Sequence, residues 1–311
     1  MKKVLITGAA GTIGKRVIKY LLMEGKYEIT VIDFKTRNNS KIFRKYHKRL
    51  NIVYGDICSN DLMEDLIRNA DYVIHLASSS PLLGNLNKNL TRNVDYKGTE
   101  TIVRLIDFYN PSCHLMYASS SSVYGMQNKN QVSTSTHIEE ETLGLFAKAK
   151  LDSENIIKKK LSNYTIFRIP VVLCNPIKED FDFSYDAKSN IEVITDEDVA
   201  YMFAKAIDKK DEINKKTYNV GGGEHSIISG IELNNLMLKG FGFTSKFIKN
   251  KMFVETSYYG YEFKDSDKLD EILNYRNDSV SSYFMRVRRS KNKHYVRKLL
   301  GKIFIKNKKK Q

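Results

Sequence analysis

The sequence has little of what disulfide-linked, metal-binding or membrane-spanning proteins need. Its 311 residues include three cysteines, Cys58, Cys113 and Cys174, whose spacing matches neither a disulfide framework nor a zinc site. This scarcity predicts a reducing compartment, no structural disulfides and no metal. No stretch approaches the roughly 18 apolar residues of a transmembrane helix, and the first apolar run ends at Thr7, too early for a signal peptide. We therefore expect a cytoplasmic protein.

Acidic residues are absent after Asp278. Residues 281–311 carry 12 lysines and arginines out of a formal net charge of +15, which leaves only +3 on the first 280 residues. Between Lys293 and Lys306, apolar residues recur on one helical face. A basic amphipathic helix over residues 286–311 suits an anionic membrane surface, whereas a solvated or docked terminal helix is the alternative. Nucleic acid is the least favoured partner, because no recognisable nucleic-acid-binding fold accompanies the charge.

Glycines are concentrated in one turn near the N-terminus. An apolar run suited to a buried strand, Val4–Thr7, leads into three glycines at intervals of three, and a helical pattern follows. Glycine allows a tight turn and close approach of a ligand, and the helix start directs its N–H groups and positive dipole end at that ligand. This pattern predicts a pyrophosphate site formed by Gly8, Gly11, Thr12, Ile13 and Gly14.

An acid ends the second strand-like run, Glu28–Asp33. Asp33 lies 19 positions beyond Gly14, where a dinucleotide-binding fold presents a carboxylate to the adenosine ribose. A carboxylate there repels a 2′-phosphate, so NAD is favoured over NADP. Lys35 and Arg37 lie close enough to weaken this preference.

Strand-like runs alternate with helical patterns along the first half of the chain, which predicts an α/β fold. We expect a Rossmann-type doubly wound parallel sheet over residues 1–174 and a small C-terminal α/β substrate lobe over 175–280, interleaved with the first domain. The lobe is expected to include the strand Tyr218–Val220 and the helix Glu197–Ile207. A basic helical tail over 281–311 completes the predicted organisation.

Further segments, in order and spacing, resemble one family. Tyr117–Gly125 reads YASSSSVYG, and similar landmarks are Gly55–Ile57, His75–Ala77, Asn93-Val94 with Gly98-Thr99, Arg168–Pro170, Asn175-Pro176, Asp198–Ala200 and Tyr218–Gly223. Over about residues 3–235 the chain resembles the extended short-chain dehydrogenase/reductases, the NAD-dependent nucleotide-sugar epimerases and dehydratases. The resemblance implies further cofactor-binding residues, namely Asp56, Ile57, Leu76, Ala77, Ser78, Asn93, Lys150 and Pro170.

Catalysis in this family uses a serine or threonine, a tyrosine and a lysine. The resemblance assigns the serine to Ser120 and the lysine to Lys150, and it places the tyrosine four residues before the lysine, at Phe146. A phenyl ring has no hydroxyl and cannot transfer a proton. Three explanations stay open: the chemistry has been lost, another group such as His137 or Tyr124 replaces it, or Phe146 is an engineered change.

The resemblance implies an oxidoreductase-like enzyme with NAD that acts on a sugar or nucleotide-sugar hydroxyl. The alternative is a catalytically silent NAD-binding sensor or partner protein, acting at a membrane surface through the tail. The segment between Asn175 and Asp198 is only about 20 residues, shorter than the family's usual substrate insert. The aromatic group at residues 258–263 either stacks on a substrate ring or packs the lobe. A homodimer through the helices Gly98–Tyr109 and Ala147–Lys160 is also implied.

Overall fold

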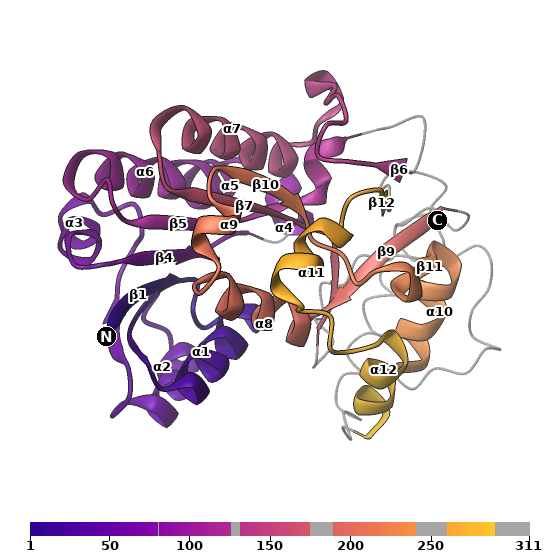
Figure 1. Cartoon of the computed structure of the whole chain (residues 1–311), viewed down its shortest axis with the longest axis horizontal. Helices are drawn as coiled ribbons and strands as arrows, with labels where there is room; N and C mark the ends of the chain where they lie inside the picture. The colour runs from indigo at the N-terminus through magenta and orange to yellow at the C-terminus, as the bar shows by residue number, and fades with distance from the viewer. Residues whose placement is uncertain (80, 126–130, 175–188, 241–259, 290–311) are drawn as a thin grey trace, which may run out of the picture.

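The computed structural model describes residues 1–79, 81–125, 131–174, 189–240 and 260–289 (Figure 1). Its centre is a parallel seven-stranded sheet in the order β10-β7-β5-β4-β1-β2-β3. The strands are β1 (Lys2–Thr7), β2 (Tyr27–Asp33), β3 (Asn51–Tyr54), β4 (Tyr72–His75), β5 (His114–Ser120), β7 (Tyr164–Ile169) and β10 (Lys216–Asn219). The predicted doubly wound sheet is therefore confirmed.

Helices cover both faces of this sheet, which is why its strands are almost continuously apolar. On one face, α1 packs against α8, while α3, α6 and α7 cover the other face (Figure 1). The remaining helices of this region are short and lie in the connections. The bounds are α1 (Thr12–Glu24), α2 (Arg37–Phe43), α3 (Asn60–Arg68), α4 (Pro81–Leu86), α5 (Lys88–Thr91), α6 (Gly98–Tyr109), α7 (Leu145–Lys160), α8 (Asp196–Ala206) and α9 (Lys210–Ile213).

The chain order reverses between β1 and β4, which are neighbours in the sheet. In open parallel sheets, ligands bind outside the carboxyl ends of the strands at such a reversal, because the connecting loops diverge there. This edge carries the glycine turn after β1, Asp33 at the end of β2 and the serine-rich segment at the end of β5.

A smaller lobe is built on a three-stranded sheet in the order β11-β9-β8. Helices α10 and α12 pack on it around Leu233, Tyr283 and Phe284. A two-stranded pair, β12 with β6, adjoins it. The bounds are β6 (Gln131–Val132), β8 (Val171–Leu173), β9 (Asn190–Thr195), β11 (Ile227–Ser229), β12 (Glu262–Phe263), α10 (Gly230–Gly240), α11 (Asp267–Leu273) and α12 (Val280–Arg289).

Two sequence assignments in this part of the chain were wrong. The strand predicted at Tyr218–Val220 is β10, which pairs with β7 in the large sheet, and the helix that follows β9 packs against α1. The predicted tail begins too early, because α12 belongs to the core of the small lobe. Tyr283 donates a hydrogen bond to the Cys174 carbonyl at 2.7 Å, and Arg286 pairs with Asp278. The amphipathic segment 293–306 lies outside the described residues.

Within the described ranges, no helix combines the length and apolar character needed to cross a membrane.

Candidate functional site

The glycine turn is closely packed against the end of β4. Gly8 has a positive φ of 64°, and a Cβ on it would lie 2.6 Å from the Ala77 backbone nitrogen. A Cβ on Gly14 would lie 2.7 Å from the Gly8 carbonyl oxygen. The sequence therefore needs glycine at both positions, in agreement with the tight turn predicted from the spacing.

The N-terminus of α1 opens onto this turn. Its N-cap residue is Gly11, no side chain caps the helix, and Lys15 is the first residue whose N–H bonds back to the Gly11 carbonyl. The N–H groups of Thr12 and Ile13 precede that bond at the helix start, which is where helices leave N–H groups for a ligand. An uncapped helix start beside two obligatory glycines fits a pyrophosphate.

Asp33 lies across the turn at the end of β2. Its Oδ2 accepts a hydrogen bond from the Ala10 backbone at 2.9 Å, and its Oδ1 accepts bonds from the Phe34 backbone at 2.8 Å and the Asn39 amide at 3.0 Å. These bonds fix the carboxylate, and a carboxylate can accept more than three hydrogen bonds in total. The remaining acceptor capacity fits a hydroxyl of an adenosine ribose.

The other predicted cofactor residues line the same edge of the sheet. Asp56 and Ile57 follow β3; Asp56 is exposed, while Ile57 is buried against Gly98. Leu76, Ala77 and Ser78 follow β4, and Pro170 follows β7; Leu76, Ala77 and Pro170 are half-buried and Ser78 is exposed. Their places suit a bound dinucleotide, and their individual roles stay predictions.

Lys150 and Phe146 occupy one face of α7, as the four-residue spacing predicts. Lys150 is 2% exposed; its Nζ donates to the Ala118 carbonyl at 3.0 Å and lies 5.7 Å from the centroid of the Phe146 ring. Ser120, at the end of β5, is half-buried and accepts hydrogen bonds from the backbone and the hydroxyl of Ser122. The described structure therefore brings the serine, the lysine and the phenyl ring to one edge of the sheet.

Sequence reasoning missed Asp95. Its carboxylate is fully buried, and its Oδ1 lies 3.7 Å from the Lys150 Nζ. Asn93, selected by the motif, is exposed. Asp95 is buried and Asn93 is exposed because a π-helical turn over Arg92–Lys97, directly before α6, changes the face that each residue presents. An acid two residues beyond the selected asparagine was the only signal in the sequence.

His75 connects this region to the glycine turn. Its Nδ1 lies 2.6 Å from the Thr7 hydroxyl and its Nε2 lies 2.9 Å from the Thr99 hydroxyl, which in turn donates to the Asp95 carbonyl. Burial, with a smaller contribution from the Lys150 charge, lowers the pKa of His75 to about 3. The imidazole is therefore neutral and acts as a hydrogen-bonded spacer in this site.

Tyr124 does not replace the missing phenol. It is fully buried, its hydroxyl donates to Asn219 Oδ1 at 2.7 Å, and burial raises its pKa. Its ring packs against Tyr261, which with Phe263 forms a small buried cluster, so the described members of the aromatic group pack the lobe. His137 is exposed in the connection between β6 and α7.

A buried ion pair supports the strands behind the site. Glu154 accepts hydrogen bonds from the Arg168 guanidinium at 2.7 and 3.0 Å and from the Ser119 hydroxyl at 2.6 Å. Burial alone would raise the pKa of Glu154, but the hydrogen bonds and charge of Arg168 outweigh it and lower the pKa. This pair joins α7 to β7 and β5, and it is structural.

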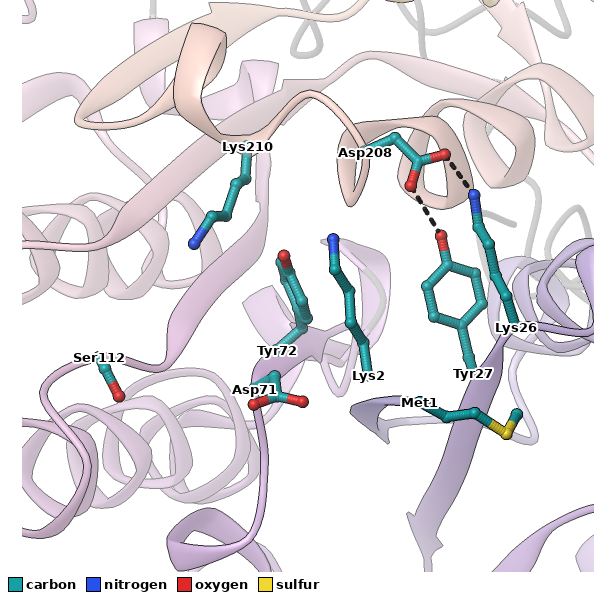
Figure 2. A pocket seen from close by; sticks show the side chains of 9 residues that line it. All are labelled: Met1, Lys2, Lys26, Tyr27, Asp71, Tyr72, Ser112, Asp208 and Lys210. Carbon is teal, nitrogen blue, oxygen red and sulfur yellow. Dashed lines mark hydrogen bonds and ion pairs between the residues drawn. The ribbon is translucent and has the colours of Figure 1, made fainter.

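A pocket of about 630 Å³ lies at the opposite, amino end of β1, β2 and β4 (Figure 2). Its lining includes Lys2, Lys26 and Lys210, and Lys26 is already paired with Asp208 at 2.7 Å. None of the predicted cofactor or catalytic residues line it. The described residues also contain no group of three or more metal-ligating side chains.

Comparison with known proteins agrees with this geometry. The model of the "NAD dependent epimerase/dehydratase family" matches residues 4–189. A dTDP-glucose 4,6-dehydratase of Mycolicibacterium smegmatis is 32% identical over 128 residues, covering 40% of this chain and 38% of the relative. The bifunctional polymyxin resistance protein ArnA of Wigglesworthia glossinidia brevipalpis is 25% identical, covering 86% of this chain and 46% of the relative. The chain thus spans less than half the length of these relatives.

Two solved structures share the fold over nearly the whole chain. The UDP-glucuronic acid 4-epimerase of Bacillus cereus, in complex with UDP-glucuronic acid and NAD, has a TM-score of 0.77 at 21% identity and covers 96% of this chain and 99% of its own. The dTDP-glucose 4,6-dehydratase DesIV of Streptomyces venezuelae has a TM-score of 0.76 at 21% identity, with coverages of 96% and 99%.

Proposed function

The chain belongs to the NAD-dependent epimerase/dehydratase family, and from this premise we propose that it binds NAD and acts on a hydroxyl of a nucleotide-diphosphate sugar. The observation that carries the proposal is the meeting, at one sheet edge, of the glycine turn, Asp33 and Lys150. Glycines that tolerate no Cβ are needed where a ligand approaches the backbone. The two glycines keep the turn tight against the end of β4, and this leaves the start of α1 open for a cofactor.

Each part of the site has a role in this proposal. The start of α1 holds the pyrophosphate, and Asp33 holds the adenosine ribose and disfavours NADP. Lys150 would hold and orient the nicotinamide ribose. When bound, NAD supplies the hydride acceptor for the oxidation of a substrate carbon. Ser120 accepts two hydrogen bonds from Ser122, which leaves its own hydrogen for the substrate oxygen.

A second candidate function is a catalytically silent NAD-binding sensor or partner protein. Two observations favour it: Phe146 has no hydroxyl, and the charge of Lys150 is already paired with Asp95. Native mass spectrometry of freshly purified protein tests the premise that both candidates share, because each requires a bound NAD. A chain that neither retains nor takes up NAD would exclude both.

Phe146→Tyr separates the two candidates. If the chain is an enzyme in which no other group replaces the phenol, the new phenol raises turnover of dTDP-glucose or UDP-glucuronic acid, since such a group contributes about 10²–10⁴ in rate. If the protein is silent, turnover stays at background although NAD binds. Phe167→Tyr, which adds a hydroxyl to another buried ring, is the control for an effect of the hydroxyl on folding alone.

Two partner assignments belong to the same proposal. The outer face formed by α6 and α7 (Figure 1) is proposed as a homodimer surface. Phe108, on α6, is 76% exposed. Phe108→Glu should then convert the dimer to a monomer in light scattering. The basic segment after α12 is proposed to contact anionic membranes, because it carries nine lysines and arginines and no acid over residues 290–311.

A further inference from the structure

Asp95 is bound by more groups than a packing role needs. Its Oδ2 accepts a hydrogen bond from the Ser79 hydroxyl at 2.5 Å, and its Oδ1 accepts one from the Ser78 hydroxyl at 2.6 Å and one from the Ser79 backbone at 3.1 Å. The Lys150 Nζ lies 3.7 Å from the same Oδ1. A fully buried carboxylate is retained only with such compensation, so the sequence has built an anion into this site.

The Ser79 hydroxyl lies beside the ring that occupies the tyrosine position. A Cβ on Gly84 would meet the Ser79 Oγ at 2.7 Å and the Phe146 Cδ2 at 3.0 Å, so both atoms border the same small space. Ser79 is half-buried, whereas Asp95 is fully buried. The serine is therefore the member of the pair that is accessible from outside the core.

We propose that Ser79 and Asp95 together replace the missing phenol, with Ser79 as the catalytic hydroxyl and Asp95 as the proton acceptor behind it. This inference rests on the proposed function. In substrate oxidation, the substrate O–H bond breaks and its proton passes to Ser79 Oγ, while the Ser79 proton passes to Asp95 Oδ2. The hydride from the same substrate carbon leaves to NAD, so the alcohol loses one proton and one hydride and becomes a carbonyl.

Ser78 also donates its hydroxyl to Asp95, but Ser79 is the serine that borders the Phe146 ring. Lys150 and Ser120 do not fit the acceptor role. The protonated Lys150 amine has no lone pair with which to accept a proton. Ser120 hydrogen-bonds to Ser122 and to no described carboxylate, so it has no acid to receive its proton. Lys150 acts instead as a positioning residue, because its Nζ lies 3.7 Å from the Asp95 Oδ1.

The test uses the full chain with NAD and either UDP-glucuronic acid or dTDP-glucose as the probe. Reduction of the nicotinamide is followed by its absorbance in a single turnover, and NAD affinity is measured separately by calorimetry. Ser79→Ala should slow reduction by about 10²–10⁴ at unchanged NAD affinity, whereas Ser79→Thr, which keeps the hydroxyl, should lose much less of the rate than Ser79→Ala. Asp95→Asn should slow reduction as much as Ser79→Ala.

Adding Phe146→Tyr to Ser79→Ala should recover the rate, because the phenol bypasses the serine; a purely structural loss would not be recovered. Full activity of Ser79→Ala would overturn the proposal. So would a wild-type chain that reduces no NAD while Phe146→Tyr does, since the chain would then require a phenol. If NAD binds but neither chain reduces it with either probe, the substrate class of the proposed function fails, and the relay fails with it.

Discussion

Replacing Glu154 by glutamine should destabilise the protein strongly without changing its shape. The carboxylate is fully buried and lies 2.7 Å from the Arg168 guanidinium, whose side chain is 4% exposed. At an effective dielectric constant of about 20, charges at that distance attract by about 6 kcal/mol. The glutamine amide keeps part of this attraction as a neutral hydrogen bond. We therefore expect the free energy of unfolding to decrease by about 3–5 kcal/mol, the usual cost of removing one partner of a buried pair.

Urea denaturation of the two proteins measures this loss directly. A melting experiment should show a fall of about 6–10 °C, since 1 kcal/mol corresponds to about 2 °C in a chain of this size. Glu64→Gln is the matched control, because Glu64 pairs with Arg68 at the same 2.7 Å on the exposed surface of α3. That pair should contribute much less, because solvent screens exposed charges. Equal losses in the two variants would refute the argument that burial decides the strength of the pair.

The pH dependence gives an independent check. Arg168 holds the pKa of Glu154 below its ordinary value, so the stability from the pair is present above that ordinary value. It is lost as the pH falls through the lowered pKa of the folded protein. The glutamine variant has no such proton to take up. Its stability should therefore fall less between neutral and acid pH than that of the wild type.

Three other predictions concern separate parts of the molecule. His75 has a pKa of about 3 in the folded protein, so only the unfolded chain takes up its proton as the pH falls from about 6.5 towards 3. The free energy of unfolding should therefore decrease by up to about 1.4 kcal/mol per pH unit over that range. His75→Asn should make the stability measured in urea less dependent on pH there. Gly8→Ala should abolish NAD binding in calorimetry, whereas Gly25→Ala, with a similar φ and no atom within 4 Å of its Cβ, should retain it. Deletion of residues 290–311, which spares α12, should abolish sedimentation with anionic vesicles and leave NAD binding unchanged; equal sedimentation of both chains would contradict the membrane assignment.

The sequence was most informative where function is encoded in local spacing. The glycine interval and the position of Asp33 are consequences of one strand-turn-helix-strand unit, so they can be predicted without knowing the rest of the fold. The pairing of β10 with β7 could not be predicted in this way, because it joins segments about 50 residues apart whose order depends on packing. For the same reason, α12 was predicted as part of the tail. Its sequence is rich in basic residues, but the small lobe buries three of its side chains, Tyr283, Phe284 and Val287.

The absence of a tyrosine changes the electrostatics of the site as well as its acid/base chemistry. In a site with a tyrosine, the lysine lowers the phenol pKa because the cation favours the phenolate. Phe146 offers no such anion, and a cationic side chain as deeply buried as Lys150 needs a partner of opposite charge. Asp95 supplies it at 3.7 Å, permanently rather than only during turnover. A lost phenol and a buried acid in a π-helical turn look independent in the sequence. In the structure, both determine which group lies beside the charge of Lys150.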